Sequence, residues 1–588
     1  MNTAPYPTWW YFFSIVSLGG WSAFTIYYTM IKSNREKTPG PKPHELWNLL
    51  HIIPMGLLNL TVTKSLSVKD KGLLFFTALM VYRYWRTIVT IYFYFRYKIA
   101  SDDSPQDPKY GPSDCTVIVA TVGPAGNHVF MEMVEGILRN QPKRLIFSAN
   151  NPGARKDIEK VVKSVIVTMQ AGESCIKEQY GPVGTIFNGE ITKIEYEHIE
   201  DSNKRKQNYH AIKMVETAIT VMADDTAIWH PKFLKALLPA FKDDSVGLVG
   251  TRKQVRYERP SYNPKEMNCI KFCMDWYYAG LWNNNGALYL QRHNYEIQAS
   301  NTADGALFAM SGRTLAALSV VLQDEKFEEA FENEHVHKWV FDLLTSLDEW
   351  HFPRANQVLT YCKKKGLSEK GIGPLLADDD NFITRWFINH GYSIKVQSSP
   401  EATITTVLGD VKNFKFLDQC ARWSRTTFRQ NPIALFSDRT IWWKWPIGVW
   451  TVYFPWLYNF AMIWDFSAVY AFRKSGLYLD SPNGNTRLLY LVSFIWLTKL
   501  VKTLPWFLEH RLDFLLYFFP IPAVPLFSYW HSVIKIHTAL TCWNNEWSGR
   551  NVKKAQDAAG ILAEIKKAKG VTAEDVADIK PTTGLKEE

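Results

Sequence analysis

Cysteine is scarce in this chain of 588 residues, which contains seven. The odd count excludes a complete disulfide framework and fits the reduced thiols of a reducing compartment. Cys269 and Cys273 have helical spacing, but two thiols without nearby His or further Cys make a poor zinc site. Despite a formal net charge of +10, Lys and Arg form no long basic stripe, so no nucleic-acid partner is expected.

Apolar side chains are abundant, with 47% hydrophobic and 14% aromatic residues. Residues 9–31 carry no charged side chain and are long enough to cross a bilayer, which takes about 20 residues. They lack the basic start and the cleavage site of a signal peptide, so we expect a retained anchor. Further apolar stretches lie at residues 46–62, 72–95, 446–472, 488–508 and 512–540. The sequence therefore predicts a multi-span membrane protein.

Basic residues flank the N-terminal apolar stretches. Lys32 and Arg35 follow the first stretch, and Arg96 and Lys98 end the third. The positive-inside rule places both flanks in the cytosol. The central part of the chain, residues 100–428, has ordinary polarity, so we expect it to form a cytosolic domain.

Strand-like and helical patterns alternate at the start of this central part. A β-branched run covers residues 115–122, a helical pattern covers residues 128–140, and a second strand-like run covers residues 144–150. Strand, helix and strand in this order predict a parallel sheet, whose ligands bind beyond the carboxyl ends of the strands. Asn150 ends the second strand, where a nucleotide base or ribose could be held.

An acidic pair follows a third strand-like run. Residues 217–222 are rich in β-branched side chains and deliver Asp224 and Asp225 to a loop. Two carboxylates at a strand end are suited to a divalent cation that bridges a diphosphate. Taken alone, the pattern also fits an acidic strand-to-helix turn in which Asp caps the helix.

A fourth motif combines groups that recognise phosphate and sugar. Gln419, Arg422 and Trp423 form Q-x-x-R-W on a predicted helix, where residues three and four apart share a face. Arg offers a planar fork for phosphate oxygens. Trp offers an apolar face on which a sugar can stack, and Gln can hydrogen-bond sugar hydroxyls.

These motifs, in this order between apolar segments, resemble the processive family 2 glycosyltransferases, the group of hyaluronan, chitin and cellulose synthases. Within the group, the chain is most similar to fungal hyaluronan-synthase-like polysaccharide synthases. The resemblance covers residues 82–550 and includes "ADDTAIW", "NTADGALFAMSGRT", "LADDDNFITRW", "QCARWSRTTFRQN" and "WSGR". It implies a GT-A-like, nucleotide-sugar-binding α/β domain inserted between N- and C-terminal transmembrane helices of a plasma-membrane protein.

The resemblance also implies the organisation and partners of the chain. Four parts are expected: an N-terminal transmembrane region (1–99), the cytosolic GT-A-like domain (100–428), interfacial and transmembrane helices that form a channel (429–540), and a gating-loop-like segment with a polar tail (541–588). The expected partners are a UDP-sugar donor, a growing polysaccharide acceptor and the lipid bilayer. The enzyme would be an inverting glycosyltransferase that polymerises sugar and passes the product through its own helices.

Three consecutive acids, Asp378, Asp379 and Asp380, lie within "LADDDNFITRW", and we call them the D-D-D run. This run contains the catalytic residue that the resemblance implies. In such enzymes the acid before a conserved helix is the general base that deprotonates the acceptor hydroxyl, and Asp379 matches that position. Its acidic neighbours are expected to raise its pKa by like charge. Asp378 and Asp380 are expected to hold the acceptor or to shape the loop.

The implied metal is Mg²⁺ or Mn²⁺. Asp225 matches the last acid of the family's D-x-D motif, Asp224 takes its middle position, and Ala223 replaces its first acid. Coordination would then rest on Asp225 with diphosphate oxygens and water.

Further site residues follow from the same resemblance. The expected donor-binding residues are Lys204, Arg205, Asn150, Arg422, Trp547 and Arg550. The expected acceptor-binding residues are Gln419, Trp423, Ser311, Gly312, Asp378 and Asp380.

Charged residues interrupt the apolar stretches. Arg83, Arg86 and Asp465 are costly in lipid, so they are expected to face a polar channel or to pair with one another. For the two arginines, long side chains that reach the membrane interface are an equally open alternative. For Lys499 we expect instead a long side chain that reaches the membrane interface. The prolines of "FFPIPAVPLF" predict that residues 512–540 bend and return to the cytosolic face, because proline disfavours helix at the residue before it.

Two alternative functions stay open from the sequence. One is a non-processive transferase that acts on a lipid or another small acceptor, against which Q-x-x-R-W argues. The other is an inactive membrane scaffold that keeps the fold, which the loss of an acid at Ala223 motivates.

Overall fold

The structure is a computed structural model that describes residues 69–101, 108–176, 192–200, 203–263, 268–336, 338–349, 355–364, 372–375, 378–408, 415–518 and 523–544. The first two apolar stretches, at residues 9–31 and 46–62, lie outside the described residues. Trp547 and Arg550, predicted to bind the donor, lie outside them as well.

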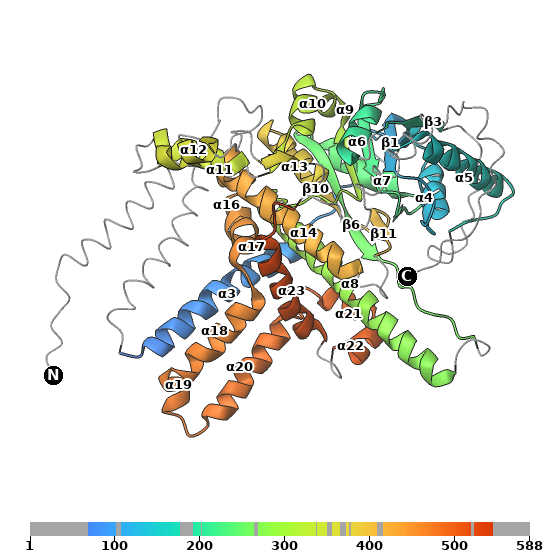
Figure 1. Cartoon of the computed structure of the whole chain (residues 1–588). Coiled ribbons are helices and arrows are strands. Elements are labelled where there is room, and N and C mark those ends of the chain that lie inside the picture. Colours follow the sequence, from blue (N-terminus) through green and yellow to red (C-terminus); the bar gives the residue numbers. More distant parts are fainter. Residues whose placement is uncertain are drawn as a thin grey trace, which may run out of the picture. The chain divides into compact units, whose positions relative to one another are not determined.

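A mixed nine-stranded sheet forms the upper part of the molecule in Figure 1. Its strands follow the order β3-β2-β1-β4-β7-β6-β11-β5, and β10 pairs with β6. The strands are β1 (Cys115–Thr121), β2 (Arg144–Ala149), β3 (Lys193–His198), β4 (Ile219–Ala223), β5 (Ala227–Ile228), β6 (Val246–Val255), β7 (Thr314–Leu318), β10 (Ser393–Gln397) and β11 (Thr403–Thr406). A separate antiparallel pair consists of β8 (His335–Val336) and β9 (Ile372–Pro374).

The first strands confirm the predicted parallel sheet. β1 pairs in parallel with β2 and with β4, so that Val117 lies between Leu145 and Val221. These strands are buried because their apolar side chains meet helices on both faces of the sheet. Their carboxyl ends therefore meet at one edge, which brings together the loops that follow β1, β2 and β4.

Helices cover the sheet and extend beyond it (Figure 1). Up to residue 364 they are α3 (Lys71–Arg96), α4 (Phe130–Arg139), α5 (Pro152–Gln170), α6 (Lys204–Ile212), α7 (Phe233–Leu237), α8 (Cys269–Asp304), α9 (Ser319–Leu322), α10 (Glu325–Glu332), α11 (Lys338–Glu349) and α12 (Ala355–Lys364). After residue 378 they are α13 (Asp379–Asn389), α14 (Lys415–Pro432), α15 (Thr440–Lys444), α16 (Pro446–Gly448), α17 (Phe454–Tyr458), α18 (Ala461–Arg473), α19 (Gly476–Leu479), α20 (Gly484–Thr498), α21 (Leu504–Glu509), α22 (Arg511–Tyr517) and α23 (Ala523–Ala539). The short 3₁₀ segments η4 (Pro112–Asp114) and η5 (Leu238–Lys242) and the π-helical segments η6 (Ile433–Asp438) and η7 (Val449–Tyr453) complete the set.

Helices α3, α8, α18, α20 and α23 pack together, and we call them the helix group. α3 contacts α8 and α18, α18 contacts α20 and α23, and α23 also contacts α8 and the site helix α14. The long helix α8 additionally contacts β6 and β10 of the sheet. The helix group is therefore joined to the sheet through α8, and to the site helix α14 through α23.

No helix within the described ranges combines the length and the apolar character needed to cross a membrane. The apolar stretch 446–472 is divided among α16, η7, α17 and α18, and the stretch 488–508 between α20 and α21. The stretch 512–540 is divided between α22 and α23, and Pro525 lies inside α23. Pro520 and Pro522 lie outside the described residues, so the predicted bend and return to the cytosolic face stay a prediction.

The charged residues of the apolar stretches pair with one another. Arg83 Nη2 lies 3.2 Å from Oδ1 of Asp465, and Lys499 Nζ lies 2.7 Å from its Oδ2. The pairing expected of Arg83 and Asp465 is confirmed. The expectation for Lys499 was wrong, because its side chain is buried against Asp465 instead of extending to an interface.

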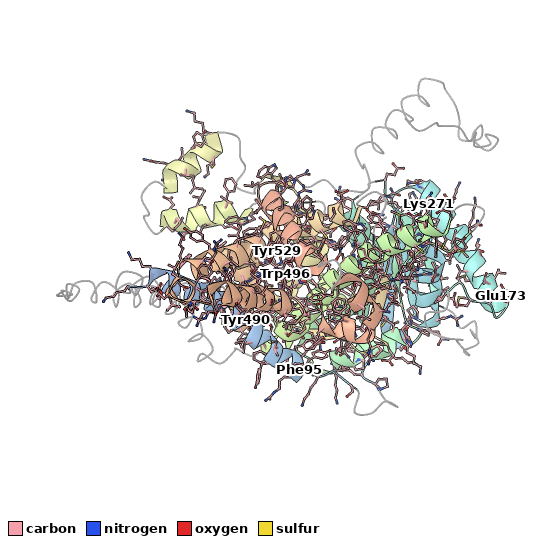
Figure 2. The ribbon with its side chains drawn as sticks, turned by 90° about the horizontal axis from the view of Figure 1, so that it is seen from below. Phe95, Glu173, Lys271, Tyr490, Trp496 and Tyr529 are labelled. Atoms are coloured by element: carbon pink, nitrogen blue, oxygen red, sulfur yellow. The ribbon has the colours of Figure 1, made fainter. Side chains whose placement is uncertain are left out.

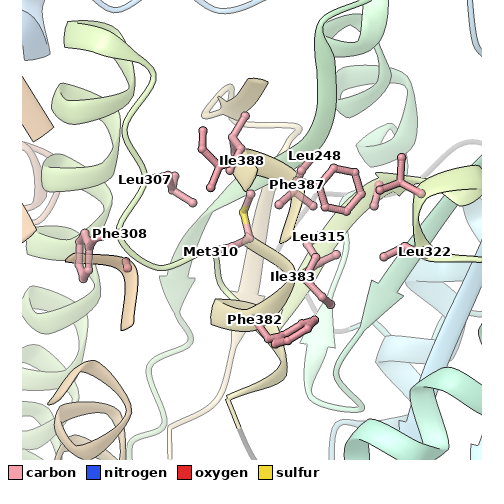
Figure 3. Close-up of a cluster of buried hydrophobic side chains, with 14 of the residues drawn as sticks. Leu248, Leu307, Phe308, Met310, Leu315, Leu322, Phe382, Ile383, Phe387 and Ile388 are labelled. Carbon is pink, nitrogen blue, oxygen red and sulfur yellow. The ribbon is translucent and has the colours of Figure 1, made fainter. Parts of the chain in front are cut away.

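Helix α13 is held in place by its apolar face (Figure 3). Phe382, Ile383 and Phe387 are buried in one core cluster with Leu248 of β6 and Leu315 of β7. Burying a side chain of this size stabilises the fold by about 1.5–3 kcal/mol relative to leaving it exposed. This packing fixes the start of α13, where the three consecutive acids lie.

Candidate active site

The acidic pair lies just past the end of β4. Asp225 is 8% exposed, and its Oδ2 accepts a hydrogen bond from Thr121 Oγ1 at 2.6 Å. Asn127 Nδ2 donates to the backbone carbonyl of Asp225 at 2.7 Å. These bonds tie Asp225 to the loop after β1, whereas the carboxylate of Asp224 faces Lys204.

Lys204, the first residue of α6, connects the two acidic segments. Its Nζ lies 2.9 Å from Oδ1 of Asp224 and 3.2 Å from Oδ2 of Asp379. Burial alone would lower the pKa of Lys204, but the two carboxylates more than offset this and raise the pKa. A charged ammonium group therefore joins the predicted metal-binding segment to the predicted base.

Asp379 is the first residue of α13 and is 6% exposed. Besides its contact with Lys204, its Oδ2 accepts a hydrogen bond from Asn208 Nδ2 of α6 at 3.1 Å. Its Oδ1 has no hydrogen-bond partner in the part of the chain that the structure describes. A carboxylate held by one oxygen has lone pairs on the other with which to accept a proton.

Asp380 contacts residues 311–314, which we call the S-G-R-T loop. Its Oδ2 accepts a hydrogen bond from the backbone N–H of Gly312 at 2.9 Å. A Cβ atom at residue 312 would lie 3.1 Å from the same oxygen, so glycine allows this close approach. Burial raises the pKa of Asp380, and the neighbouring carboxylate of Asp379 raises it further, to about 6. The effect of like charge that the D-D-D run predicts is thus seen at Asp380.

Asp378 is clamped by helix α14. Arg429 donates from Nε and Nη2 to its two carboxylate oxygens at 2.8 and 2.9 Å, and Thr426 Oγ1 donates to Oδ1 at 2.6 Å. Burial would raise the pKa of Asp378, but the charge and hydrogen bonds of Arg429 outweigh burial and lower it. The backbone of Asp378 is left-handed, with φ of 62°, which is uncommon for a non-glycine residue. The clamp fixes this backbone conformation one residue before Asp379.

Arg205 is buried beneath the site. Its Nη2 donates to Glu334 Oε2 at 2.6 Å and to the carbonyl oxygen of Asp378 at 3.2 Å, and its Nη1 donates to the carbonyl oxygen of Phe331 at 2.7 Å. Arg205 is 1% exposed. The structure therefore places this predicted donor-binding side chain among protein groups that support the D-D-D run.

The Q-x-x-R-W motif lies on α14, as predicted. Burial lowers the pKa of Arg422, and the carboxylates of Asp224 and Asp380 act in the opposite direction. The guanidinium of Arg313 lies 5.1 Å from the centroid of the Trp423 ring. The same ring stacks on Tyr289 of α8 at 5.2 Å. The motif therefore lies close to the Asp224–Asp225 pair, to the D-D-D run and to the S-G-R-T loop.

The remaining predicted residues lie at the margins of this site. Gln419 lies on α14 one turn before Trp423 and is partly exposed. Ser311 Oγ accepts a hydrogen bond from the backbone N–H of Arg313 at 3.4 Å. Asn150 follows β2 and accepts a hydrogen bond from Asn151 Nδ2 at 2.9 Å. None of these contacts defines a ligand, so their roles stay predictions.

Several residues of the site were not assigned from the sequence, and three of them illustrate why. They are Asn208, Arg313 and Arg429. Each lies close in the sequence to residues that were assigned: Asn208 follows Lys204 and Arg205, Arg313 follows Ser311 and Gly312, and Arg429 lies within Q-C-A-R-W-S-R-T-T-F-R-Q-N. The signal was therefore present, but only the fold shows which side chain of each stretch turns toward the acids.

The acidic pair is compatible with a divalent cation. Across the described ranges, no three His, Cys, Asp or Glu side chains are grouped so as to hold a metal ion. Asp224 and Asp225 nevertheless supply carboxylate oxygens, the donors that Mg²⁺ and Mn²⁺ prefer. Mg²⁺ is commonly bound by one or two carboxylates together with substrate phosphates. The pair fits a cation that arrives with a diphosphate.

Comparison with solved structures returns a remote likeness. The mannosyltransferase PcManGT from Pyrobaculum calidifontis, in complex with GDP-Man and Mn²⁺, is 13% identical, with a TM-score of 0.40 over 81% of this chain and 100% of that one.

Sequence comparisons relate the chain to known glycosyltransferases. Residues 182–426, which include Asp225, Asp379 and Arg422, match the family described as Glycosyltransferase like family 2. A type 2 glycosyltransferase of Pyricularia oryzae is 28% identical over 520 residues, which are 87% of this chain and 89% of that protein. A type 2 glycosyltransferase of Gibberella zeae is 28% identical over 489 residues, which are 82% and 76% of the two chains. Residues 182–426 are therefore similar to family 2 glycosyltransferases, the relatives are type 2 glycosyltransferases over most of their length, and the protein is a glycosyltransferase.

Proposed function

We propose that this protein is a membrane-embedded, inverting glycosyltransferase that uses a UDP-sugar to extend a polysaccharide. The observation that carries the proposal is the position of Lys204, whose ammonium group contacts both Asp224 and Asp379. The predicted donor-binding and acceptor-activating parts of the site would thereby meet at Lys204. The choice of UDP and of a polymeric acceptor rests on the resemblance to hyaluronan, chitin and cellulose synthases.

The geometry supports a direct displacement. The acceptor hydroxyl oxygen attacks the anomeric carbon of the donor, and the bond from that carbon to the diphosphate oxygen breaks. Asp379 takes the hydroxyl proton, and the nucleoside diphosphate leaves. One base and one direct attack invert the anomeric centre without a covalent enzyme intermediate. Lys204, Arg313 and Arg422 bring positive charge to the side on which the diphosphate would lie.

The surface of the helix group supports membrane embedding. Phe95, Phe466, Tyr490 and Trp530 are each more than half exposed on α3, α18, α20 and α23. Figure 2 views the molecule from below and labels Phe95 and Tyr490. Large exposed apolar surfaces on a protein mark contacts with a membrane or a partner.

A divalent cation would be held by Asp225 and Asp224. When bound, Mg²⁺ or Mn²⁺ would neutralise charge on the diphosphate. We expect Asp225→Asn to weaken the binding of Mn²⁺ and of UDP together, by about tenfold or more, because it removes an anionic oxygen ligand. Titration of the purified protein with each ligand measures this, with the exposed Asp157→Asn of α5 as control. If neither Mg²⁺ nor Mn²⁺ affects UDP binding by the unmodified protein, the metal assignment fails.

Protonation of Asp380 is expected to make the rate of sugar transfer depend on pH. Its pKa of about 6 means that it is charged above this pH and neutral below it. We expect kcat/KM to fall as the pH drops through about 6, because Asp380 then becomes neutral and accepts a weaker hydrogen bond from the Gly312 N–H, which loosens the loop beside the predicted base. Asp380→Asn, which stays neutral, should be less active at high pH and should lack this fall. An identical acid limb in Asp380→Asn would assign the titration to another group.

The test of the proposed function is UDP release by the full chain, purified in detergent, across a panel of UDP-sugars, followed by sizing of the product. Release with one sugar and a product of high mass is expected. Short products would favour the non-processive alternative. Absence of UDP release with every sugar, in protein that still binds UDP, would refute the proposed function.

A further inference from the structure

A polar cavity of about 170 Å³ lies within the helix group. Its walls come from α3, α8 and α23, together with residues around Trp456 and Lys499. Among the described residues that line it, Glu296 is the single carboxylate, whereas six side chains are cationic: Arg83, Arg86, Arg292, Lys499, Lys502 and Lys535. The cavity therefore has an excess of positive charge.

Four of the six cations have partners within the protein. The partners are Asp465 for Arg83 and Lys499, Glu296 for Lys502, and the carbonyl oxygens of Trp456 and Asn459 for Lys535. Charges inside a helical layer are costly unless they are paired in this way.

Arg86 and Arg292 differ from these four. No hydrogen bond or ion pair joins either guanidinium group to another residue in the ranges that the structure describes, and the one carboxylate that attracts both, Glu296, is already bonded to Lys502. Arg86 also lies one turn from Arg83 on the same face of α3, so their like charges repel. Two guanidinium groups that face a cavity in this way are suited to an anion with several oxygens, because each offers a planar fork of donors.

The cavity adjoins the predicted acceptor site. Tyr289 of α8 lines the cavity, and its ring stacks on Trp423 at a centroid distance of 5.2 Å. Asn285, Ser528 and Ser532 also line the cavity and offer hydrogen bonds to hydroxyl groups. A sugar chain whose end lies at Trp423 would therefore find polar and cationic groups behind Tyr289.

We propose that Arg86 and Arg292 bind an anionic group of the acceptor, either the carboxylate of a uronic acid residue or the phosphate of a phosphorylated acceptor. The proposal deepens the proposed function and rests on it, since it takes Trp423 as the acceptor platform. The acceptor is then an acidic molecule, and the two arginines select for its charge.

The test measures binding, without turnover, by the full chain in neutral detergent. The probes are a disaccharide with a terminal uronic acid, its carboxyl-reduced neutral counterpart, and dodecyl phosphate in the micelle. We expect at least one anionic probe to bind about tenfold or more tightly than the neutral disaccharide, as hydrogen bonds to charged groups allow. Arg86→Gln and Arg292→Gln should each abolish that preference.

Matched variants keep the result interpretable. Arg96→Gln removes an exposed charge from the last turn of α3 and should change nothing, and Arg86→Lys should retain part of the preference because it keeps the charge. Preference for the uronic acid identifies a saccharide carboxylate, and preference for dodecyl phosphate alone identifies a phosphate. Equal binding of neutral and anionic probes, or a preference that survives both Gln variants, would overturn the proposal. Loss of turnover with the preference intact would count against the proposed function only.

Discussion

Asp379→Asn is expected to abolish sugar transfer while UDP binding is largely kept. The neutral amide cannot take the proton of the acceptor hydroxyl, and losing a general base typically costs about a hundredfold to ten-thousandfold in rate. The amide has nearly the same shape, so the hydrogen bond that joins this side chain to Asn208 can be replaced by one of similar geometry. UDP release and UDP binding, measured side by side on the purified variant, separate the two effects.

The control for this prediction is Asp157→Asn on the exposed face of α5. It makes the same chemical change far from α13 in the sequence and should leave transfer unaltered. Turnover of Asp379→Asn within about tenfold of the parent would remove Asp379 from the role of base. Loss of UDP binding in Asp379→Asn would instead mean that its contact with Lys204 organises the donor side.

The sheet could be predicted from the sequence because its strands carry a local signal. β1, β2 and β4 are continuous apolar runs, as expected for strands buried on both faces, and each is followed by a polar loop. The return of β7 between β4 and β6, antiparallel to both, could not be predicted in this way. Such pairing depends on contacts between residues far apart in the chain, which no local pattern contains.

The three acids of the D-D-D run are adjacent in the sequence, but the sequence does not predict that each contacts a different part of the fold. Asp378 turns to Arg429, Asp379 to Asn208 and Lys204, and Asp380 to the backbone of Gly312. The left-handed backbone at Asp378 and the start of α13 separate their directions. Three like charges in a row are therefore tolerated because each has its own donors.

The basic run N-K-R-K gives a second example. A residue and its successor on an α-helix point in different directions, because 3.6 residues complete a turn. Lys204 thus reaches the acids of the site, whereas Arg205 turns to Glu334 beneath them. Only the packing of α6 decides which of the two side chains faces a ligand. Lys499 was misjudged for a related reason, since Asp465, its partner, is distant in the sequence.

Arg429 connects the D-D-D run to the end of the described chain. Besides clamping Asp378, its Nη1 donates to the carbonyl oxygens of Cys542 and Asn544 at 3.0 and 3.1 Å. One guanidinium group therefore spans α14, the residue before Asp379 and the segment that leads toward W-S-G-R. Its side chain is 2% exposed, so water cannot replace these bonds at low cost.

Arg429→Ala is expected to lower the free energy of unfolding by about 3–5 kcal/mol, because it leaves the buried charge of Asp378 without its partner. Denaturant titration of the purified protein measures this loss, with Lys415→Ala at the exposed start of the same helix as control. The double variant Asp378→Ala, Arg429→Ala should be more stable than Arg429→Ala alone, since it removes the orphaned charge. If the pair also positions Asp379, even the folded fraction of Arg429→Ala should transfer sugar more slowly while it binds UDP normally. Stability equal to that of Lys415→Ala would show that the clamp is dispensable and that α13 is placed by its apolar face alone.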